Sequence, residues 1–189
     1  MSTDSPSMGP FKHCWIEEGR LLHSNLPLAH DLQALRELGV ASIINCAATG
    51  VGDPDGLADY GGGERGDAFR RELEDALRAA GIPETQLDIP FGMAGMNRDG
   101  AELSRAWEHY LARRDRGVVL VHCRAGQDRS ATVLGGIIAR RDGLSGRDAI
   151  ELVRERSCLA DPDPRAADLI DHWLAFGDEG PPEDAEGPA

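Results

Sequence analysis

The chain has 189 residues, long enough for one domain with a substantial hydrophobic core. Its formal net charge of -13 disfavours nucleic acid and anionic membrane surfaces as partners. No run approaches about 18 uninterrupted apolar residues, so the sequence predicts no membrane-spanning helix.

The predicted helices and strands alternate along the chain, which indicates an α/β domain. They are, in chain order, a helix at 30–39, a strand at 40–46, a loop at 48–66, a helix at 67–80, a strand at 86–89, a loop at 90–98, a helix at 101–113, a strand at 117–122 and helices at 131–141, 145–156 and 164–176. Apolar residues at helical spacing are expected to face the core. Among them are Leu32, Leu35, Leu73, Leu77, Leu103, Trp107, Tyr110, Leu111, Leu169, Ile170, Trp173 and Leu174.

The predicted domain covers residues 11–176 and is flanked by two loose segments. Residues 1–10 form an N-terminal tail, and residues 177–189 form a disordered tail with five acidic and no basic residues. The four cysteines lack paired spacing, and no apolar run lies near the N-terminus. These features indicate a reducing, cytoplasmic setting.

One cysteine, Cys123, lies six positions before Arg129, between a short apolar strand and a predicted helix. A loop from a strand into a helix turns its backbone N–H groups toward an anion, and the helix dipole adds partial positive charge. The same surroundings favour a reactive thiolate near neutral pH. Arg129 offers a planar fork for two phosphoryl oxygens, so the segment predicts a phosphate-binding nucleophile.

The spacing alone is a weak signal, because Cys14 and Arg20 repeat it. No apolar strand precedes that copy, no helix follows it, and Glu17 and Glu18 would repel a phosphate. Around Cys123, by contrast, Gly126 permits close backbone approach. The alternative interpretation is a buried, inert cysteine at the end of a strand.

The segment His122-Cys-Arg-Ala-Gly-Gln-Asp-Arg-Ser130 resembles the signature loop of the protein tyrosine phosphatase superfamily, His-Cys-x-x-Gly-x-x-Arg-Ser/Thr. Residues 15–27, 32–47 and 87–90 resemble the first strands, a helix with the central strand, and the strand before the general-acid loop of small bacterial and dual-specificity-like members. The resemblance covers residues 12–176. It implies one domain with a central, mostly parallel sheet flanked by helices.

The resemblance further implies two-step phosphoryl transfer that needs no metal or cofactor. Cys123 attacks phosphorus, and the loop around it holds the phosphate oxygens. The phosphate-binding residues are then Arg124, Ala125, Gly126, Gln127, Asp128 and Arg129. Ser130 is expected to donate to the Cys123 sulfur, to cap the following helix, or both. His122 is expected to support the loop by hydrogen bonds, since a thiolate has no proton for a base to remove.

The general acid is where this sequence departs from the family pattern. Relatives place an aspartate a few residues after Ile-Pro, but residues 91–98 contain no carboxylate. Asp128, inside the signature loop, is the first candidate, because some bacterial phosphatases carry Gly-Lys-Asp-Arg there. Asp88 and Asp99 are the alternatives, with Asp99 equally suited to cap a helix. Asp128 is otherwise a structural carboxylate, or the substrate has a leaving group that needs no strong acid.

The sequence alone leaves the substrate class open. Gln127 stands where phosphoinositide phosphatases often have lysine, which weakens the case for a highly charged headgroup, although Arg124 compensates in part. The Gly-rich insertion at 50–66 is placed to shape a pocket. We favour a small phosphomonoester such as a nucleotide, nucleoside or sugar phosphate. A phosphotyrosine or other phosphopeptide substrate is the alternative, and a non-catalytic phosphate-recognising module is a second one. The sequence leaves the oligomeric state open.

Cys46 ends a strand expected to lie beside that of Cys123, and some relatives protect their nucleophile with a reversible disulfide from such a strand. Two interpretations therefore remain for Cys46, a buried unreactive thiol and a regulatory partner of Cys123.

Overall fold

The computed structural model describes residues 10–47, 63–87, 89 and 100–177. Residues 1–9 and 178–189 of the predicted tails, residues 50–62 of the insertion predicted at 50–66, and the loop at 90–98 lie outside these ranges. Its elements, in chain order, are β1 (His13–Glu17), β2 (Leu21–Ser24), a 3-10 turn (Ala29–Asp31), α1 (Leu32–Glu37), β3 (Val40–Asn45), α2 (Gly63–Ala80), β4 (Glu84–Gln86), α3 (Ala101–Arg113), β5 (Val118–His122), α4 (Arg129–Asp142), α5 (Gly146–Arg156) and α6 (Ala166–Phe176).

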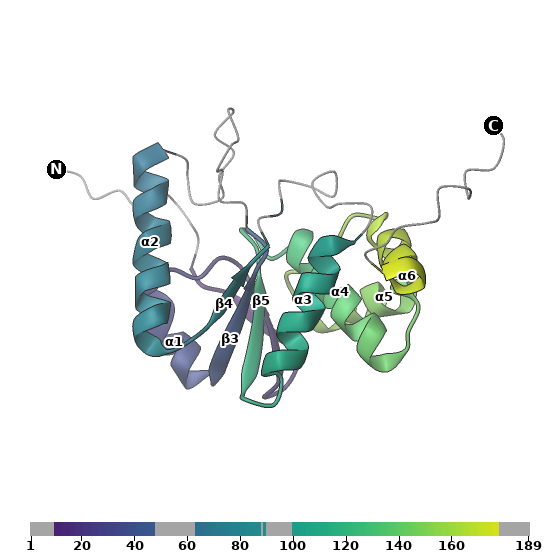
Figure 1. The fold of residues 1–189 in the computed structure, drawn as a ribbon, viewed down its shortest axis with the longest axis horizontal. Helices are drawn as coiled ribbons and strands as arrows, with labels where there is room; N and C mark the ends of the chain where they lie inside the picture. The colour runs from purple at the N-terminus through teal and green to yellow at the C-terminus, as the bar shows by residue number, and fades with distance from the viewer. Residues whose placement is uncertain (1–9, 48–62, 88, 90–99, 178–189) are drawn as a thin grey trace.

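A five-stranded sheet with the order β1-β2-β5-β3-β4 forms the centre of the domain (Figure 1). β1 runs antiparallel to β2, and the other neighbours pair in parallel. This confirms the expected α/β domain with a mostly parallel sheet. β5 lies between β2 and β3, so the loop after His122 begins at the centre of the sheet.

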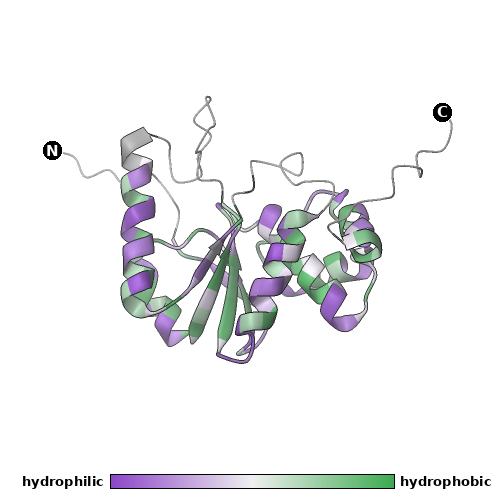
Figure 2. Ribbon diagram, in the orientation of Figure 1, coloured by the Kyte–Doolittle hydropathy of each residue, from purple (hydrophilic) through white to green (hydrophobic). Residues whose placement is uncertain are grey.

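Helices cover both faces of this sheet, with α1 and α2 on one side and α3 to α6 on the other (Figure 1). The alternation of side chains along β5 explains the two layers. Val118 and Leu120 join a core cluster with residues of α1 and α2, whereas Val119 and Val121 join a cluster with α4. In Figure 2 the central strands are mostly apolar, and the outer surface of α2 is mostly hydrophilic.

The helix that follows the Cys123 loop, α4, is the most deeply buried one, because two glycines let its neighbours approach. A Cβ on Gly135 would lie 2.8 Å from Ile150 Cδ1 on α5 and 2.9 Å from Ile170 Cδ1 on α6. A Cβ on Gly136 would lie 2.9 Å from Leu103 Cδ2 on α3. Three helices therefore hold α4, and with it the end of the loop, in a fixed position.

Some sequence predictions need correction. α2 begins at Gly63, four residues before Asp67, so the helix continues into the Gly-rich segment in spite of the low helix propensity of glycine. The fourth strand lies at 84–86 rather than 86–89, since pairing with β3 aligns Ile43 with Glu84 and Asn45 with Gln86. Leu111 and Leu174 are 42% and 36% exposed, so the buried stripes of α3 and α6 are narrower than predicted.

Two of the four cysteines form a disulfide, although their spacing in the sequence does not indicate a pair. Cys14 of β1 and Cys158, just after α5, form a disulfide, whereas Cys46 and Cys123 are free. The partners are 144 residues apart in sequence, so only the tertiary fold brings them together. None of the described helices combines the length and apolar composition needed to cross a bilayer.

Candidate phosphate-binding and nucleophile site

Cys123 lies at the carboxyl end of β5, and Arg129 begins α4. Both side chains are almost fully buried, with exposed fractions of 2% for Cys123 and 4% for Arg129. Arg124, Ala125 and Gln127 are exposed along the loop between them. The fold thus places the predicted nucleophile and the predicted guanidinium at two ends of one short loop.

The turn of this loop requires glycine at position 126. Gly126 has a φ of +74°, a left-handed conformation that costs other residues about 1–2 kcal/mol. A Cβ there would also lie 2.9 Å from the Ser24 carbonyl oxygen and 3.1 Å from Leu159 Cδ1. The loop is therefore packed against β2 and the segment after α5.

The backbone polarity of the loop suits an anion. The Leu26 N–H donates to the Arg124 carbonyl at 3.1 Å, and the Asp161 N–H donates to the Gln127 carbonyl at 3.0 Å. These bonds occupy carbonyl oxygens with neighbouring segments. Within the described ranges, no acceptor takes the backbone N–H groups of residues 124–128. Such a run of free amides before a helix N-terminus is a cradle for phosphate oxygens.

Arg129 is held by the segments that follow β3 and β4. Its Nη1 donates to the Ile89 carbonyl at 2.9 Å and to the Cys46 carbonyl at 3.4 Å. A guanidinium holds its N–H donors in a rigid planar fork, so these bonds fix the orientation of the Arg129 side chain at the end of the loop.

A buried chain of side chains leads from the nucleophile into the core. Ser130 Oγ donates to Cys123 Sγ at 3.2 Å, as the family resemblance implies. His23 of β2 bridges Ser130 Oγ at 2.8 Å and Ser157 Oγ at 2.7 Å. Sequence reasoning missed His23 and Ser157. The available signal was a histidine directly after Leu21 and Leu22 in a segment that resembles a first strand, although the sequence could not show what it contacts.

His122 differs from His23 in its contacts. Burial lowers its pKa to about 3, so the ring is neutral. A backbone hydrogen bond with Cys123 opposes this lowering of the pKa, and support of the loop by His122 stays a prediction.

Asp128, the first candidate for the general acid, has a structural contact. Its Oδ1 accepts the Asp163 N–H at 2.9 Å, and its carbonyl accepts the Thr132 hydroxyl at 3.0 Å. One carboxylate oxygen thus joins the loop to the segment before α6. Asp88 and Asp99 lie outside the described residues.

Cys46 lies beside the nucleophile loop, because its N–H donates to the His122 carbonyl at 2.8 Å. Burial raises the pKa of the Cys46 thiol well above its usual range, and the neighbouring Cys123 raises it further. Cys46 is thus a protonated and weakly nucleophilic thiol at neutral pH.

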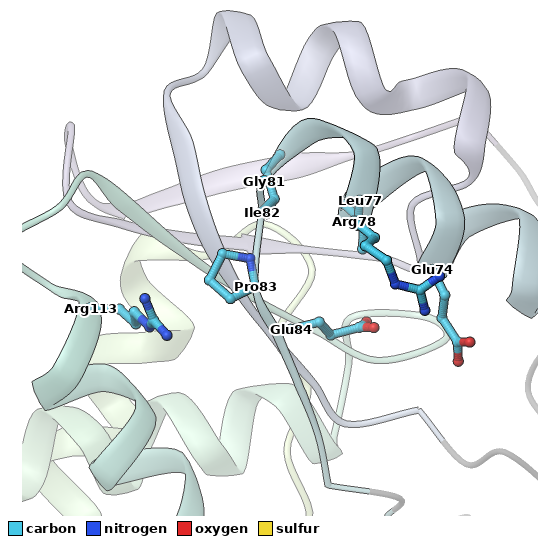
Figure 3. Close-up of a pocket in the computed structure, with 8 residues that line it drawn as sticks. All are labelled: Glu74, Leu77, Arg78, Gly81, Ile82, Pro83, Glu84 and Arg113. Atoms are coloured by element: carbon cyan, nitrogen blue, oxygen red, sulfur yellow. The ribbon is translucent and has the colours of Figure 1, made fainter.

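A cavity of about 510 Å³ lies elsewhere, at the amino end of β4 (Figure 3). It is open to solvent and lined by Glu74, Arg78, Glu84 and Arg113 among others. Burial raises the pKa of Glu84, although the hydrogen bond from Asn45 Nδ2 opposes this. The cavity contains none of the residues of the Cys123 loop. No group of three metal-ligating side chains occurs in the described part of the chain.

Comparison of the structure with solved proteins shows which fold this is. The chain superposes on PTPMT1 with a TM-score of 0.66 and 19% identity, covering 87% of this chain and 94% of that one. It superposes on Tk-PTP in its active form with a TM-score of 0.61 and 21% identity, over 84% and 92% of the two chains. The chain also superposes on the human tyrosine phosphatase-like serine/threonine/tyrosine-interacting protein. The TM-score is 0.62 and the identity 20%, and the match covers 86% of this chain and 95% of that one.

No protein-family model and no curated protein sequence matches the chain. The structural matches are consistent among themselves, and the fold is that of the tyrosine and dual-specificity phosphatases.

Proposed function

We propose that the protein is a cysteine-dependent phosphomonoester phosphatase of the tyrosine phosphatase superfamily. The observation that supports this most strongly is the arrangement of the Cys123 loop. Three features lie together between β5 and α4. They are a buried sulfur that accepts a hydrogen bond from the Ser130 hydroxyl, a buried Arg129, and loop N–H groups without an acceptor among the described residues. A protein that only binds phosphate has no need of the sulfur.

In the first step, the Cys123 thiolate attacks the phosphorus atom of the substrate in line with the leaving oxygen. A sulfur–phosphorus bond forms as the bond to the leaving oxygen breaks, and that oxygen takes a proton to depart as an alcohol. Arg129 and the N–H groups of the loop hold the three equatorial oxygens, where negative charge gathers.

In the second step, water attacks the phosphocysteine and the sulfur leaves as a thiolate. The water loses a proton, inorganic phosphate departs, and free Cys123 returns. The Ser130 hydroxyl, already directed at the sulfur, stabilises the departing thiolate by a charge-assisted hydrogen bond.

The proton donor of the first step is proposed to be Asp128, with Asp88 and Asp99 as the alternatives. Asp128 is half-buried, and its Oδ1 is engaged by the Asp163 N–H. The change Asp128→Asn is a suitable probe, because the amide oxygen can still accept this bond while the acid is lost. A comparison with Asp88→Asn and Asp99→Asn on an alkyl phosphate and an aryl phosphate identifies the donor. Replacing the true acid should lower the rate of hydrolysis far more for the alkyl phosphate, whose leaving group is poor, than for the aryl phosphate. Equal effects in all three variants would contradict the assignment.

For the substrate, we propose a small phosphomonoester such as a nucleotide, nucleoside or sugar phosphate. PTPMT1 has been crystallised in complex with PI(5)P, which supports phosphate esters in general as ligands of the shared fold. The choice of a small one rests on the charge of the loop. Here the exposed Gln127 gives the loop less positive charge than a lysine would. A screen of phosphopeptides against nucleotide and sugar phosphates tests the choice. A strong preference for peptides would reverse it.

The experiment that tests the enzymatic proposal is hydrolysis of para-nitrophenyl phosphate by wild type, Cys123→Ser and Arg129→Lys. Both variants should lose activity, because one lacks the nucleophile and the other lacks the planar fork. Arg20→Lys is the matched control. Arg20 has the same spacing from Cys14, but its side chain is 75% exposed, so activity should persist. Equal background rates in wild type and Cys123→Ser would favour a phosphate-recognising module instead.

The cytoplasmic setting is also part of the proposal. Rapid alkylation of the protein in its native cells shows whether Cys14 and Cys158 carry free thiols there. Free thiols support a reducing compartment, whereas a protected pair argues for an oxidising one.

A further inference from the structure

Four buried side chains from three separate parts of the fold form one hydrogen-bonded line that ends at the nucleophile. Ser157 follows α5, His23 lies on β2, and Ser130 is in the first turn of α4. The distances along the line are 2.7 Å from Ser157 Oγ to His23 Nδ1, 2.8 Å from His23 Nε2 to Ser130 Oγ and 3.2 Å from Ser130 Oγ to Cys123 Sγ. All four side chains are at most 4% exposed, so water does not compete for these bonds.

Counting protons gives this line a single direction. A serine hydroxyl has one proton, and Ser130 gives its proton to Cys123 Sγ, so Ser130 Oγ must accept from His23 Nε2–H. Burial lowers the pKa of His23 to about 4, so the ring carries one proton, and Nδ1 is an acceptor. Ser157 therefore donates to Nδ1, while its own oxygen accepts the Leu159 N–H at 3.2 Å. Every donor in the line points toward the sulfur.

We infer that His23 is a positioning residue for the nucleophile, which holds the Ser130 hydroxyl proton on the Cys123 sulfur. The inference rests on the proposed function, because a fixed hydroxyl matters where the sulfur is a thiolate that attacks and later departs. Aligned hydrogen bonds polarise one another, so a bond from His23 strengthens the bond from Ser130 to the sulfur. Without that bond, the hydroxyl can turn away.

Ser157 lies at the other end of this line of hydrogen bonds and orients His23. Its hydroxyl makes Nδ1 the acceptor and so keeps the ring proton on Nε2. Without Ser157, the ring can take the other tautomer, in which Nε2 accepts from Ser130 and draws the hydroxyl away from Cys123. The structure thus predicts the same direction of effect from two residues on different elements, with a smaller effect from Ser157.

The test measures the pH midpoint of Cys123 alkylation by iodoacetamide, which reports thiolate formation and requires no phosphatase turnover. His23→Leu removes the donor and is expected to raise the midpoint by about one pH unit, the scale of one hydrogen bond to a charged group. His23→Gln keeps an N–H donor at about the position of Nε2 and should restore most of the shift. The neighbouring His122 and Arg129 are the same in all variants.

A double-mutant cycle separates positioning from general damage to the core. If His23 acts through Ser130, then His23→Leu adds no further shift once Ser130→Ala is present. Ser42→Ala is the control, since Ser42 is also fully buried in the sheet but lies on β3, away from this line. It should leave the midpoint unchanged.

The outcomes distinguish this inference from the proposed function. Additive shifts in the cycle, or an unchanged midpoint in His23→Leu, would overturn the positioning role. If His23→Leu does not fold, Ser157→Ala is measured in its place. An unchanged alkylation midpoint in Ser157→Ala would likewise overturn the positioning role. The enzymatic proposal fails separately if wild type shows the predicted alkylation pattern but no hydrolysis that depends on Cys123.

Discussion

The two buried histidines, His23 and His122, should make the fold sensitive to mild acid. Burial lowers the pKa of His23 from 6.5 to about 4 and that of His122 from 6.5 to about 3. Below pH 6.5 the unfolded chain therefore binds protons that the folded chain does not. Stability is highest above the unfolded pKa and falls as the pH approaches the folded values.

The size of the effect follows from the shifts. At about 1.4 kcal/mol per pKa unit, each histidine lowers the free energy of unfolding by about 2 kcal/mol between pH 7 and 5, and by about 3 kcal/mol at pH 4. Burial raises the pKa of Glu84, which acts in the opposite direction over this range. The free energy of unfolding of a small domain is about 5–15 kcal/mol in total, so we expect the protein to unfold in acid near pH 4.

Urea unfolding, followed by tryptophan fluorescence, measures the change in the free energy of unfolding between pH 7 and pH 5. Wild type and His23→Gln are compared at both pH values. The variant should lose about 2 kcal/mol less than wild type over that interval, whatever its stability at pH 7, because it lacks the His23 ring. Identical losses in the two proteins would refute the argument, since they would show that His23 titrates normally in the folded state.

Three further predictions concern the loop, the disulfide and Cys46. Gly126→Ala should destabilise the protein more than Gly143→Ala. Both glycines have a left-handed backbone conformation, but only a Cβ at position 126 would contact Ser24 and Leu159. Equal losses of stability in urea unfolding would count against the close approach. Cys158→Ser should lower the free energy of unfolding by up to about 5 kcal/mol, since the disulfide closes a loop of 144 residues, and a reducing agent should reproduce this loss in wild type but not in the variant. At neutral pH, mass spectrometry should find Cys123 alkylated and Cys46 unmodified, since burial raises the pKa of Cys46; a crosslink between the two after mild peroxide would instead support the regulatory interpretation.

Local patterns predicted the elements whose boundaries are local. α3 begins and ends at the residues expected for it, because Gly100 with a φ of +73° precedes it and its apolar spacing continues to the end. Ser145 caps α5 as predicted, accepting the Asp148 N–H at 3.1 Å. β5 and α4 were recognised by composition, so the position of the Cys123 loop between a strand and a helix followed directly.

Features that depend on contacts between distant segments were missed. The position of β4 is decided by its register with β3, and the Cys14–Cys158 bond joins residues that are far apart in sequence. His23 was not singled out, because a histidine in an apolar strand has no assigned role until Ser130 and Ser157 are placed beside it. Asp128 was recognised as a candidate, but its bond to the Asp163 N–H was not predictable from sequence.

The most direct test of the central claim is to trap the covalent intermediate. Wild type is mixed with a phosphomonoester, quenched rapidly in denaturant and digested, and the peptide that contains Cys123 is examined by mass spectrometry. We predict that this peptide gains the mass of one phosphoryl group, that the gain is absent in Cys123→Ser, and that no other peptide is modified. Hydrolysis that proceeds without any phosphoryl group on Cys123 would contradict the account.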